Sequence, residues 1–395
     1  MKHRVLVLGA GYAGAYTAGC LARRLAPADA SITVVNAEPD FVERMRNHQV
    51  AAGQDLRRRP LAEMFAGTGV DLRIARVTAL DPGARTVAVA GDGGAGELGY
   101  DTLVYALGSA AADGGVPGVA EHAFHVTSRP AALRLRAHLD GLAPGSRVLV
   151  VGEGLTGIET ATELAESRPH LAVAMAARGE PGAWLSDGAR RHLRRAFERL
   201  GVEVRTGTAV ERVEPGRAVA AGGVIEAEAV VWAGGFAVHP VAAASGLEVT
   251  GTGQIAVDAT MRSVSHPDVY AAGDSVHAIG ANGRPLPMSC ASAGFTSMQA
   301  VNAIVGRLTG RRVAATALLY YGNHISLGRR DAIFQFVDRE ANAKSWYLGG
   351  QTAARLKNAV LKGSAWSEAH PTFGMPKRRH RLAGAAERAG EALAA

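Results

Sequence analysis

The sequence predicts an α/β fold with two parallel β-sheets, because one local pattern occurs twice along the chain. In each case a short apolar strand runs into closely spaced glycines and then into a helical segment, with strands at 4–8 and 147–151 and helices at 15–25 and 158–167. A second apolar strand follows each helix, at 31–35 and 171–176. This alternation is typical of doubly wound, Rossmann-like domains. We therefore expect two such domains and a small α+β region at the C-terminal end.

The first glycine loop has the pattern Gly-x-Gly-x-x-Gly between its strand and its helix. Gly9 allows the tight turn, Gly11 lets the backbone approach a pyrophosphate, and Gly14 allows close packing of helix on strand. The N-terminus of the following helix stabilises phosphate charge. The loop therefore predicts a dinucleotide site that these three glycines line together with Tyr12 and Ala13.

The next strand ends at Asn36, where an acidic residue usually binds the ribose of the dinucleotide. The Asn36 amide can hydrogen-bond a ribose hydroxyl, although without the extra strength of a charged bond. Glu38 is a nearby substitute. We expect Asn36 to contact the ribose.

The second loop contains Gly152, Gly154, Thr156 and Gly157, so we expect the chain to bind a second dinucleotide there. The strand that follows lacks the terminal acid that marks an unphosphorylated ribose. It ends instead beside Arg178, whose guanidinium can pair with a 2′-phosphate. This favours NADPH slightly over NADH, although a solvent-exposed arginine at a strand end would look the same in sequence.

Glu153 lies between the first two glycines of the second loop. A carboxylate near a pyrophosphate is unfavourable unless it points away. If it points inward, binding of a nicotinamide coenzyme would be weak or lost.

Three further segments make a family resemblance specific. Residues 101–109 form a strand that ends at Gly108, residues 230–236 repeat this arrangement around Gly234, and residues 269–275 include Gly273 and Asp274. With the two glycine loops, this ordered set resembles the FAD-dependent pyridine nucleotide-disulfide oxidoreductase superfamily, type II NADH dehydrogenase-like branch, over roughly residues 1–320. The resemblance implies that FAD binds the first loop and Asp274, which would accept hydrogen bonds from the ribityl chain, and that NADPH or NADH binds the second. The alternative for Asp274 is an aspartate that only caps a helix.

The order of these motifs implies that the NAD(P)-binding domain is inserted in the FAD-binding domain. We place the FAD-binding domain at 1–112 and 245–320, the NAD(P)-binding domain at 113–244 and a C-terminal region at 321–395. In that last region, 332–337 and 345–348 are predicted strands and 352–361 a short helix.

The two cysteines do not form the redox-active pair of the family's disulfide reductases. The segment 41–48, where that branch carries its thiol, has no cysteine. Cys20 falls in the first helix, where a small buried residue is expected. Cys290 and Ala291 begin a helix whose N-terminus in the family points at the flavin. Direct hydride transfer to FAD therefore remains, with electrons released to a quinone, oxygen, another protein or an organic substrate.

Four charged or titratable residues are candidates for roles near the reacting rings. Glu159 matches the position of an acid that approaches the nicotinamide amide in related dehydrogenases, so we assign it coenzyme positioning. Arg44, Arg46 and His48 form a basic cluster that would run past the isoalloxazine, where a cation stabilises the reduced flavin. We assign Arg44 to the cofactor and His48 to the active site. The alternative for each residue of the basic cluster is a packing or surface residue. The alternative for Glu159 is an exposed glutamate that the dipole at a helix N-terminus favours.

Composition and charge limit the classes of partner that the chain is expected to bind. The chain has 395 residues, 48% hydrophobic and 20% charged, as expected of a folded protein, and its net charge of +7 comes without the aromatic-basic motifs of a nucleic-acid binder. No apolar stretch approaches the roughly 20 residues needed to span a membrane. The basic run 377–379 offers at most weak peripheral contact with lipid. We expect no metal site, and the absence of a secretory signal favours a cytoplasmic location.

We therefore expect an enzyme that transfers hydride from NAD(P)H to FAD and passes the electrons to a quinone-like or other small acceptor. The Ala-Gln quinone motif of type II NADH dehydrogenases is absent from 289–294. That absence and Glu153 favour the first alternative, a flavoenzyme acting on a specialised metabolite. The second alternative is a redox-responsive flavoprotein that binds a partner without substantial turnover.

Overall fold

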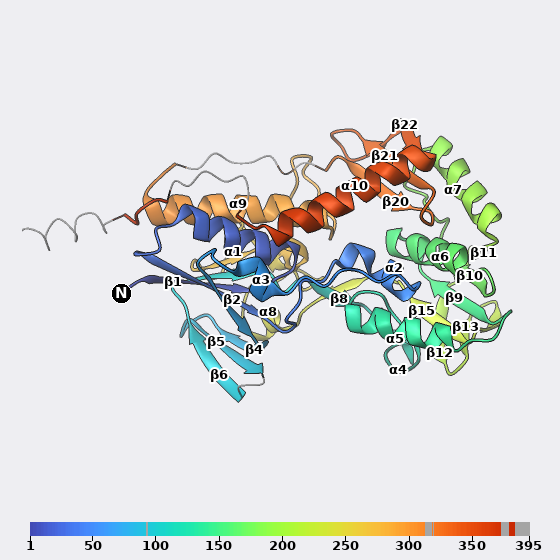
Figure 1. Cartoon of the computed structure of the whole chain (residues 1–395), viewed down its shortest axis with the longest axis horizontal. Helices are drawn as coiled ribbons and strands as arrows, with labels where there is room; N and C mark the ends of the chain where they lie inside the picture. The colour runs from blue at the N-terminus through green and yellow to red at the C-terminus, as the bar shows by residue number, and fades with distance from the viewer. Residues whose placement is uncertain (92–93, 313–317, 319, 373–378, 384–395) are drawn as a thin grey trace, which may run out of the picture.

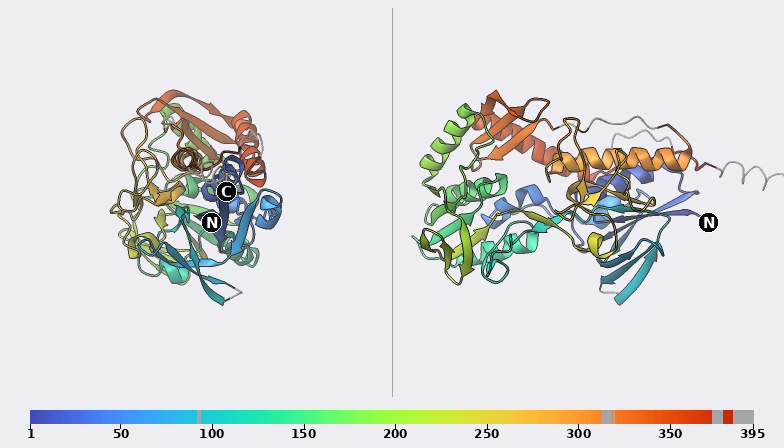
Figure 2. Two further views of the ribbon diagram at one scale, coloured as in Figure 1. Left: turned by 90° about the vertical axis from the view of Figure 1, so that its left-hand side faces the viewer. Right: turned by 180° about the vertical axis from the view of Figure 1, so that it is seen from behind.

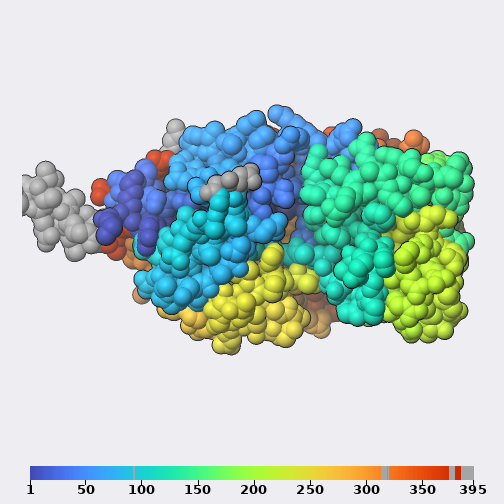
Figure 3. All heavy atoms as spheres, turned by 90° about the horizontal axis from the view of Figure 1, so that it is seen from below, coloured from blue at the N-terminus to red at the C-terminus, as the bar shows by residue number. Residues whose placement is uncertain are grey.

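The computed structural model describes residues 1–91, 94–312, 318, 320–372 and 379–383. Two lobes, each built on a parallel sheet, lie side by side, and the C-terminal elements lie across both (Figure 1). Seen from below, the surfaces of the two lobes meet along the middle of an elongated molecule (Figure 3). Lys377 and Arg378 of the basic run fall outside the described residues.

The first lobe is built on a parallel sheet of strand order β18-β7-β1-β2-β3. Its strands are β1 (His3–Leu8), β2 (Ala30–Asn36), β3 (Val70–Ile74), β7 (Thr102–Tyr105) and β18 (Val269–Ala271). Helices α1 (Tyr12–Arg24), α3 (Leu61–Phe65) and α9 (Cys290–Thr309) cover one face. The other face is covered by a three-stranded meander, β4 (Arg76–Asp81), β5 (Thr86–Gly91) and β6 (Gly94–Gly99), and by α8 (Val241–Ala244). Because both faces are covered, the central strands are continuous apolar runs.

The second lobe repeats this layout around a parallel sheet of order β11-β10-β9-β15. Its strands are β9 (Arg147–Val151), β10 (Ala172–Ala176), β11 (Glu203–Arg205) and β15 (Ala229–Trp232). One face carries α5 (Arg129–Asp140), α6 (Leu155–Ser167) and α7 (Asp187–Leu200). The other carries α4 (Val119–His122) and the meander β12 (Val210–Glu214), β13 (Arg217–Ala220) and β14 (Gly223–Glu226).

The chain leaves the first sheet after β7, builds the whole second sheet, and returns to the first as β18. The two connections run side by side, because β8 (Ser109–Ala111) pairs antiparallel with β16 (Phe236–Val238). The predicted α/β fold with two Rossmann-like units is confirmed, and the domain boundaries stay a prediction. The remaining short elements are η1 (Arg44–Arg46), β17 (Ile255–Ala256), η2 (Gly273–Ser275), β19 (Val276–His277) and α2 (Asn47–Ala51), of which α2 packs on α5 and α6 of the second lobe.

The C-terminal region is a small antiparallel sheet followed by one long helix. The sheet consists of β20 (Gly322–Ser326), β21 (Ala332–Val337) and β22 (Ala343–Gly349), and the helix is α10 (Gly350–Ala369). The expected strands are present, but the prediction of a helix of about three turns was wrong, since α10 has 20 residues. From behind, α10 runs from the small sheet toward α9 and α1 (Figure 2). The helix continues through Gly363 because its later part packs on α1, and packing stabilises a helix where local propensity does not.

The last turn of α10 contains a buried carboxyl group that destabilises the fold at high pH. No described residue hydrogen-bonds Oε2 of Glu368, and burial raises the pKa of this side chain from its ordinary 4.5 to about 8. The unfolded chain therefore binds fewer protons at this group, so stability falls as pH rises from about 4.5 to about 8. We expect Glu368→Met to raise Tm little at pH 5 and by several degrees at pH 8, measured by circular dichroism. A gain independent of pH would contradict this account.

Candidate functional site

The first glycine loop forms a turn that other residues would obstruct. Gly9 has a φ of +93°, and a Cβ there would lie 2.4 Å from the carbonyl oxygen of Ala106. A Cβ on Gly14 would lie 1.8 Å from the carbonyl oxygen of Gly9, so the start of α1 can approach the strand only because Gly14 has no side chain. A Cβ on Gly11 would meet nothing within 4 Å. The backbone at the N-terminus of α1 is therefore open to a phosphate.

Asp274 lies across from this loop, in η2. A Cβ on Gly273 would lie 3.0 Å from the Cβ of Ala13, so the two motifs are in contact. The Asp274 Oδ2 atom accepts a hydrogen bond of 2.6 Å from the hydroxyl of Ser109 and lies 3.7 Å from Nη1 of Arg44. The structure therefore gathers three segments, distant in sequence, around one carboxylate.

Arg44 holds these segments together from η1. Its Nη1 donates a hydrogen bond of 2.7 Å to the carbonyl oxygen of Ser109, and its guanidinium lies 4.9 Å from the ring centre of Phe236. Burial lowers the pKa of Arg44, and Asp274 opposes that effect. Gly108, next to Ser109, donates its N–H to the hydroxyl of Ser275 over 3.0 Å. The cluster has a cation, a carboxylate and an open glycine backbone at the carboxyl edge of the first sheet.

Asn36 lies beside the first loop but its amide already bonds to the protein. Its Oδ1 accepts from the backbone N–H of Ala10 over 2.8 Å, and its Nδ2 donates to the carbonyl oxygen of Glu38 over 2.7 Å. Asn36 thus ties the end of β2 to the loop. A contact with a ribose hydroxyl stays a prediction.

The second loop repeats the geometry of the first. Gly152 has a φ of +124°, and its Cβ would lie 2.5 Å from the carbonyl oxygen of Ala233. A Cβ on Gly157 would lie 1.9 Å from the carbonyl oxygen of Gly152, while Gly154 faces open space. Thr156 is in the first turn of α6, and its carbonyl oxygen accepts a hydrogen bond from Thr160.

Gly234 and Arg178 border this loop. Gly234 follows β15, where a Cβ would lie 2.8 Å from the Trp232 ring. The Arg178 side chain is exposed and makes no hydrogen bond or ion pair with the described residues. Glu153 points toward the end of β10, where its Oε2 accepts from the backbone N–H of Arg178 over 3.3 Å. The inward orientation that would oppose a pyrophosphate is therefore not the one found.

A buried ion pair joins α6 to α10. Glu159 accepts hydrogen bonds from Nζ of Lys357 and, over 2.9 Å, from the backbone N–H of Ser326, and Lys357 also donates to the carbonyl oxygen of His324. The two charged side chains are 12% and 10% exposed. Burial pushes the pKa of Glu159 up, but Lys357 and His48 together more than offset it, so the pKa lies below its ordinary value. The pair is therefore a carboxylate and an ammonium group largely shielded from water.

Sequence reasoning missed Lys357 as a site residue, because it occurs among exposed basic and apolar residues and its partner is 198 positions away. His48, in contrast, was predicted at the active site and lies in α2, which packs on α5 and α6. It is 4% exposed, no described residue hydrogen-bonds its Nε2, and burial lowers its pKa while Glu159 raises it. His48 is thus a buried neighbour of the ion pair, and its catalytic role stays a prediction.

The N-terminus of α9 is within electrostatic range of both this ion pair and Asp274. Cys290 and Ala291 are both exposed there, and Cys290 interacts electrostatically with Lys357 as well as with Asp274. Cys20 is buried, as expected. In the parts of the chain that the structure describes, no group of three or more His, Cys, Asp or Glu residues is arranged to hold a metal. No helix among the described residues is long and apolar enough to cross a membrane.

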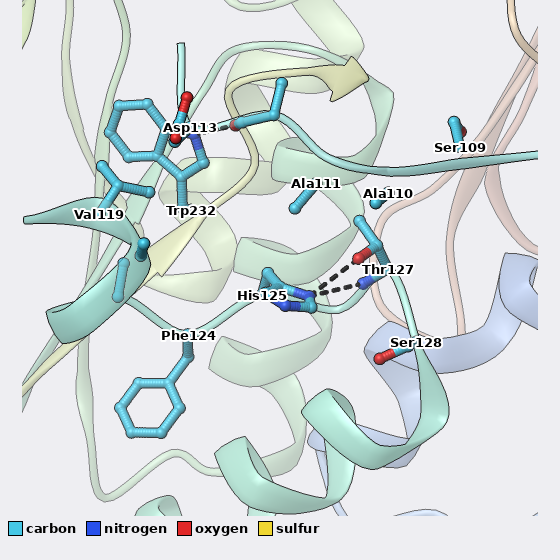
Figure 4. A pocket seen from close by; sticks show the side chains of 13 residues that line it. Ser109, Ala110, Ala111, Asp113, Val119, Phe124, His125, Thr127, Ser128 and Trp232 are labelled. Carbon is cyan, nitrogen blue, oxygen red and sulfur yellow. Dashed lines mark hydrogen bonds between the residues drawn. The ribbon is translucent and has the colours of Figure 1, made fainter. Parts of the chain in front are cut away.

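A pocket of about 390 Å³ adjoins the Asp274 cluster at the linker between the lobes (Figure 4). It is lined on one side by Ser109 and the rest of β8, and on the other by Trp232 and the turn from Phe124 to Ser128. The hydroxyl of Thr127 lies 2.8 Å from Nδ1 of His125. Burial lowers the pKa of His125, with Arg134 and Arg44 acting in the same direction. Neither glycine loop is among the residues that line this pocket, but Ser109 belongs both to the pocket and to the Asp274 cluster.

The chain matches the pyridine nucleotide-disulphide oxidoreductase family over residues 3–304. It belongs to this family. An NADH dehydrogenase-like protein of Mycobacterium tuberculosis is 32% identical over 357 residues, which cover 84% of this chain and 87% of the relative. A type II NADH:quinone oxidoreductase of Staphylococcus epidermidis is 27% identical over 91% of this chain and 94% of its own.

Solved structures share the fold. The NAD-dependent persulfide reductase from A. fulgidus has a TM-score of 0.74 and 25% identity, and the alignment covers 85% of this chain but only 64% of that protein. NDH2 from Plasmodium falciparum, in complex with NADH, has a TM-score of 0.78 at 12% identity, with 96% of this chain and all of that chain covered. At that identity the likeness concerns the fold alone.

These findings confirm the predicted family, the NADH dehydrogenase-like branch and the cofactors: the protein is an oxidoreductase that uses FAD and a nicotinamide coenzyme. The residues present fit FAD. The open backbone at Gly11 suits a pyrophosphate, and Asp274 with Arg44 provides a charged acceptor and donor for the polar part of the cofactor. The contacts of individual residues with either cofactor stay predictions.

Proposed function

We propose that this enzyme passes two electrons from NAD(P)H to a quinone-like small acceptor. The observation that carries the proposal is the buried Lys357–Glu159 pair, whose lysine is within electrostatic range of Cys290 at the α9 N-terminus. FAD, when bound, accepts hydride from NAD(P)H and releases two electrons to the acceptor. The overall reaction is NAD(P)H + H⁺ + quinone → NAD(P)⁺ + quinol.

The ion pair suits the acceptor half of this reaction. As a quinone takes up electrons, negative charge develops on its oxygens, and a shielded ammonium group stabilises such charge strongly. Lys357 would supply that charge and an N–H donor. Glu159 and the carbonyl oxygen of His324 position Lys357 by accepting hydrogen bonds from its Nζ. A contact of Glu159 with the nicotinamide amide remains part of the proposal, because the carboxylate belongs to the first turns of α6.

One feature of the site disfavours a disulfide as the acceptor. The relay of a disulfide reductase needs a pair of cysteines beside the flavin, and the 41–48 segment, which contributes Arg44 to the Asp274 cluster, contains no cysteine that could pair with Cys290. The similarity to an NADH dehydrogenase-like protein and to a type II NADH:quinone oxidoreductase supports a quinone-like acceptor over a specialised metabolite or a partner bound without turnover. A cytoplasmic location stays a prediction.

Quinone chain length provides a test of this proposal. We predict that the enzyme, reduced anaerobically by a nicotinamide coenzyme, is reoxidised by short-chain quinones without added membrane, since these reach the site through water. Because α10 is longer than predicted and exposes Leu356, Val360 and Trp366, the test also measures binding to vesicles. Stopped-flow flavin absorbance measures the rate of reoxidation by each quinone, and liposome flotation measures binding of the protein to vesicles. Salt-resistant flotation, with turnover only on long-chain quinone in vesicles, would contradict the prediction.

A further inference from the structure

The two glycine loops are equivalent position by position, but the polar side chain that lies near each loop comes from a different place. In the first unit it comes from the end of the following strand, and in the second it comes from the loop itself. Gly9 donates its N–H to the carbonyl oxygen of Val35 over 2.7 Å, and Gly152 donates to that of Ala176 over 2.9 Å. This register makes Ala10 equivalent to Glu153, and Asn36 equivalent to residue 177, which is alanine.

In the first unit the polar side chain comes from the strand end and reaches the loop, because Asn36 accepts from the N–H of Ala10. In the second it comes from the loop and reaches the strand end, because Glu153 accepts from the N–H of Arg178. A polar oxygen thus lies between loop and strand end in both units. That is where the adenosine ribose of a bound dinucleotide lies.

We propose that Glu153 replaces the missing strand-end acid, accepts hydrogen bonds from the adenosine ribose hydroxyls, and makes NADH the preferred coenzyme. This rests on the proposed use of the second loop by the nicotinamide coenzyme. It reverses the slight preference for NADPH that Arg178 suggested from sequence.

The carboxylate is held in place and keeps capacity for a ligand. A Cβ on Gly179 would lie 3.9 Å from Oε1 of Glu153, so the carboxylate lies over the backbone that follows β10. Oε2 is fixed by the Arg178 N–H. No other hydrogen bond or ion pair within the described ranges involves Glu153, so Oε1 can accept from a ribose hydroxyl.

The same carboxylate opposes a 2′-phosphate. Such a phosphate would bring a second negative charge to the position of the ribose hydroxyl, directly beside Glu153. The guanidinium of Arg178 offers limited compensation, because it is exposed and forms no ion pair with Glu153. Exposed ion pairs contribute little, since water and salt screen them. Of the two charges, the half-buried Glu153 carboxylate is the one held by a hydrogen bond at this position, so a negative charge dominates selection.

The test compares NAD⁺ and NADP⁺ binding to the FAD-loaded enzyme by titration calorimetry, together with anaerobic flavin reduction by NADH and NADPH. The parent enzyme should favour the unphosphorylated coenzyme. Glu153→Ala should weaken NAD⁺ binding about 10–100-fold, the value of one charged hydrogen bond, and should tighten NADP⁺ binding. Glu153→Gln, which keeps the side-chain shape and an acceptor oxygen, should lose less affinity for NAD⁺ while still gaining affinity for NADP⁺.

Glu180→Gln is the matched control, because it removes a nearby negative charge that pairs with Arg194 instead of facing the ribose position. It should leave the coenzyme ratio unchanged. A parent enzyme that prefers NADP⁺, or a ratio that Glu153→Ala does not move, would overturn the inference. Flavin that neither coenzyme reduces would overturn the proposed function, whereas the binding ratios would still decide the role of Glu153.

Discussion

Asp274→Ala should yield a protein that loses most of its FAD during purification. The substitution removes a carboxylate that is proposed to accept charged hydrogen bonds from the ribityl chain, each worth about 1.5–3 kcal/mol. It also removes the anion that faces Arg44 over 3.7 Å, leaving a half-buried guanidinium without its carboxylate. We expect FAD affinity to fall by at least about 10-fold, measured by fluorescence titration of apoprotein with FAD.

Ser109→Ala is the matched control for the loss of the Asp274 carboxylate. It removes the 2.6 Å hydrogen bond to Asp274 but leaves the carboxylate in place, so FAD affinity should fall less than in Asp274→Ala. Asp274→Asn keeps the shape of the side chain without its charge, and its FAD affinity should lie between those of Ser109→Ala and Asp274→Ala. Full flavin occupancy and unchanged affinity in Asp274→Ala would show that the ribityl chain binds elsewhere.

Lys357→Met should slow flavin reoxidation by quinone and should destabilise the fold. The variant leaves the buried Glu159 carboxylate without its cation, and breaking a buried pair in this way costs about 3–5 kcal/mol. Burial would then raise the pKa of Glu159 unopposed by Lys357. We expect a lower Tm and a reoxidation rate at least about 10-fold below the parent, since one electrostatic donor is lost. Reduction of the flavin by the coenzyme should change less.

Stability and function are separable in this pair. The double variant Glu159→Gln/Lys357→Met removes both charges and should recover much of the Tm without recovering quinone turnover. Lys362→Met is the control, because it removes an exposed lysine from the same helix and should change neither quantity. Reoxidation of Lys357→Met at the parent rate, with the protein folded, would remove Lys357 from the acceptor site.

The glycine loops could be predicted from sequence because their requirements are local. A strand that turns at once into a helix needs a left-handed φ at Gly9 and at Gly152, and close helix packing needs a residue without Cβ at Gly14 and at Gly157. These constraints act within a few residues, so they are visible in the spacing. The order of the motifs likewise predicted that the chain would leave the first sheet and return to it, as β7 and β18 do.

The length of α10 was not predictable in the same way. Its alanines, lysines and Gly363 give a weak local signal, and the helix extends to Ala369 because its later part packs on α1. Arg44 was assigned to the cofactor from sequence, but its contacts with the carbonyl oxygen of Ser109 and the carboxylate of Asp274 were not predictable, because both are distant in sequence.

The sequence by itself determined that this protein has two dinucleotide-binding units of one fold, because each unit is encoded by short-range backbone requirements. Only the tertiary structure decided which charges face each other. Lys357 pairs with Glu159, which is 198 positions away in sequence. Glu153 points toward the end of β10 and not toward the pyrophosphate position. No periodicity or spacing encodes such contacts, because the free energy of a buried charge depends on the partner that the fold brings to it.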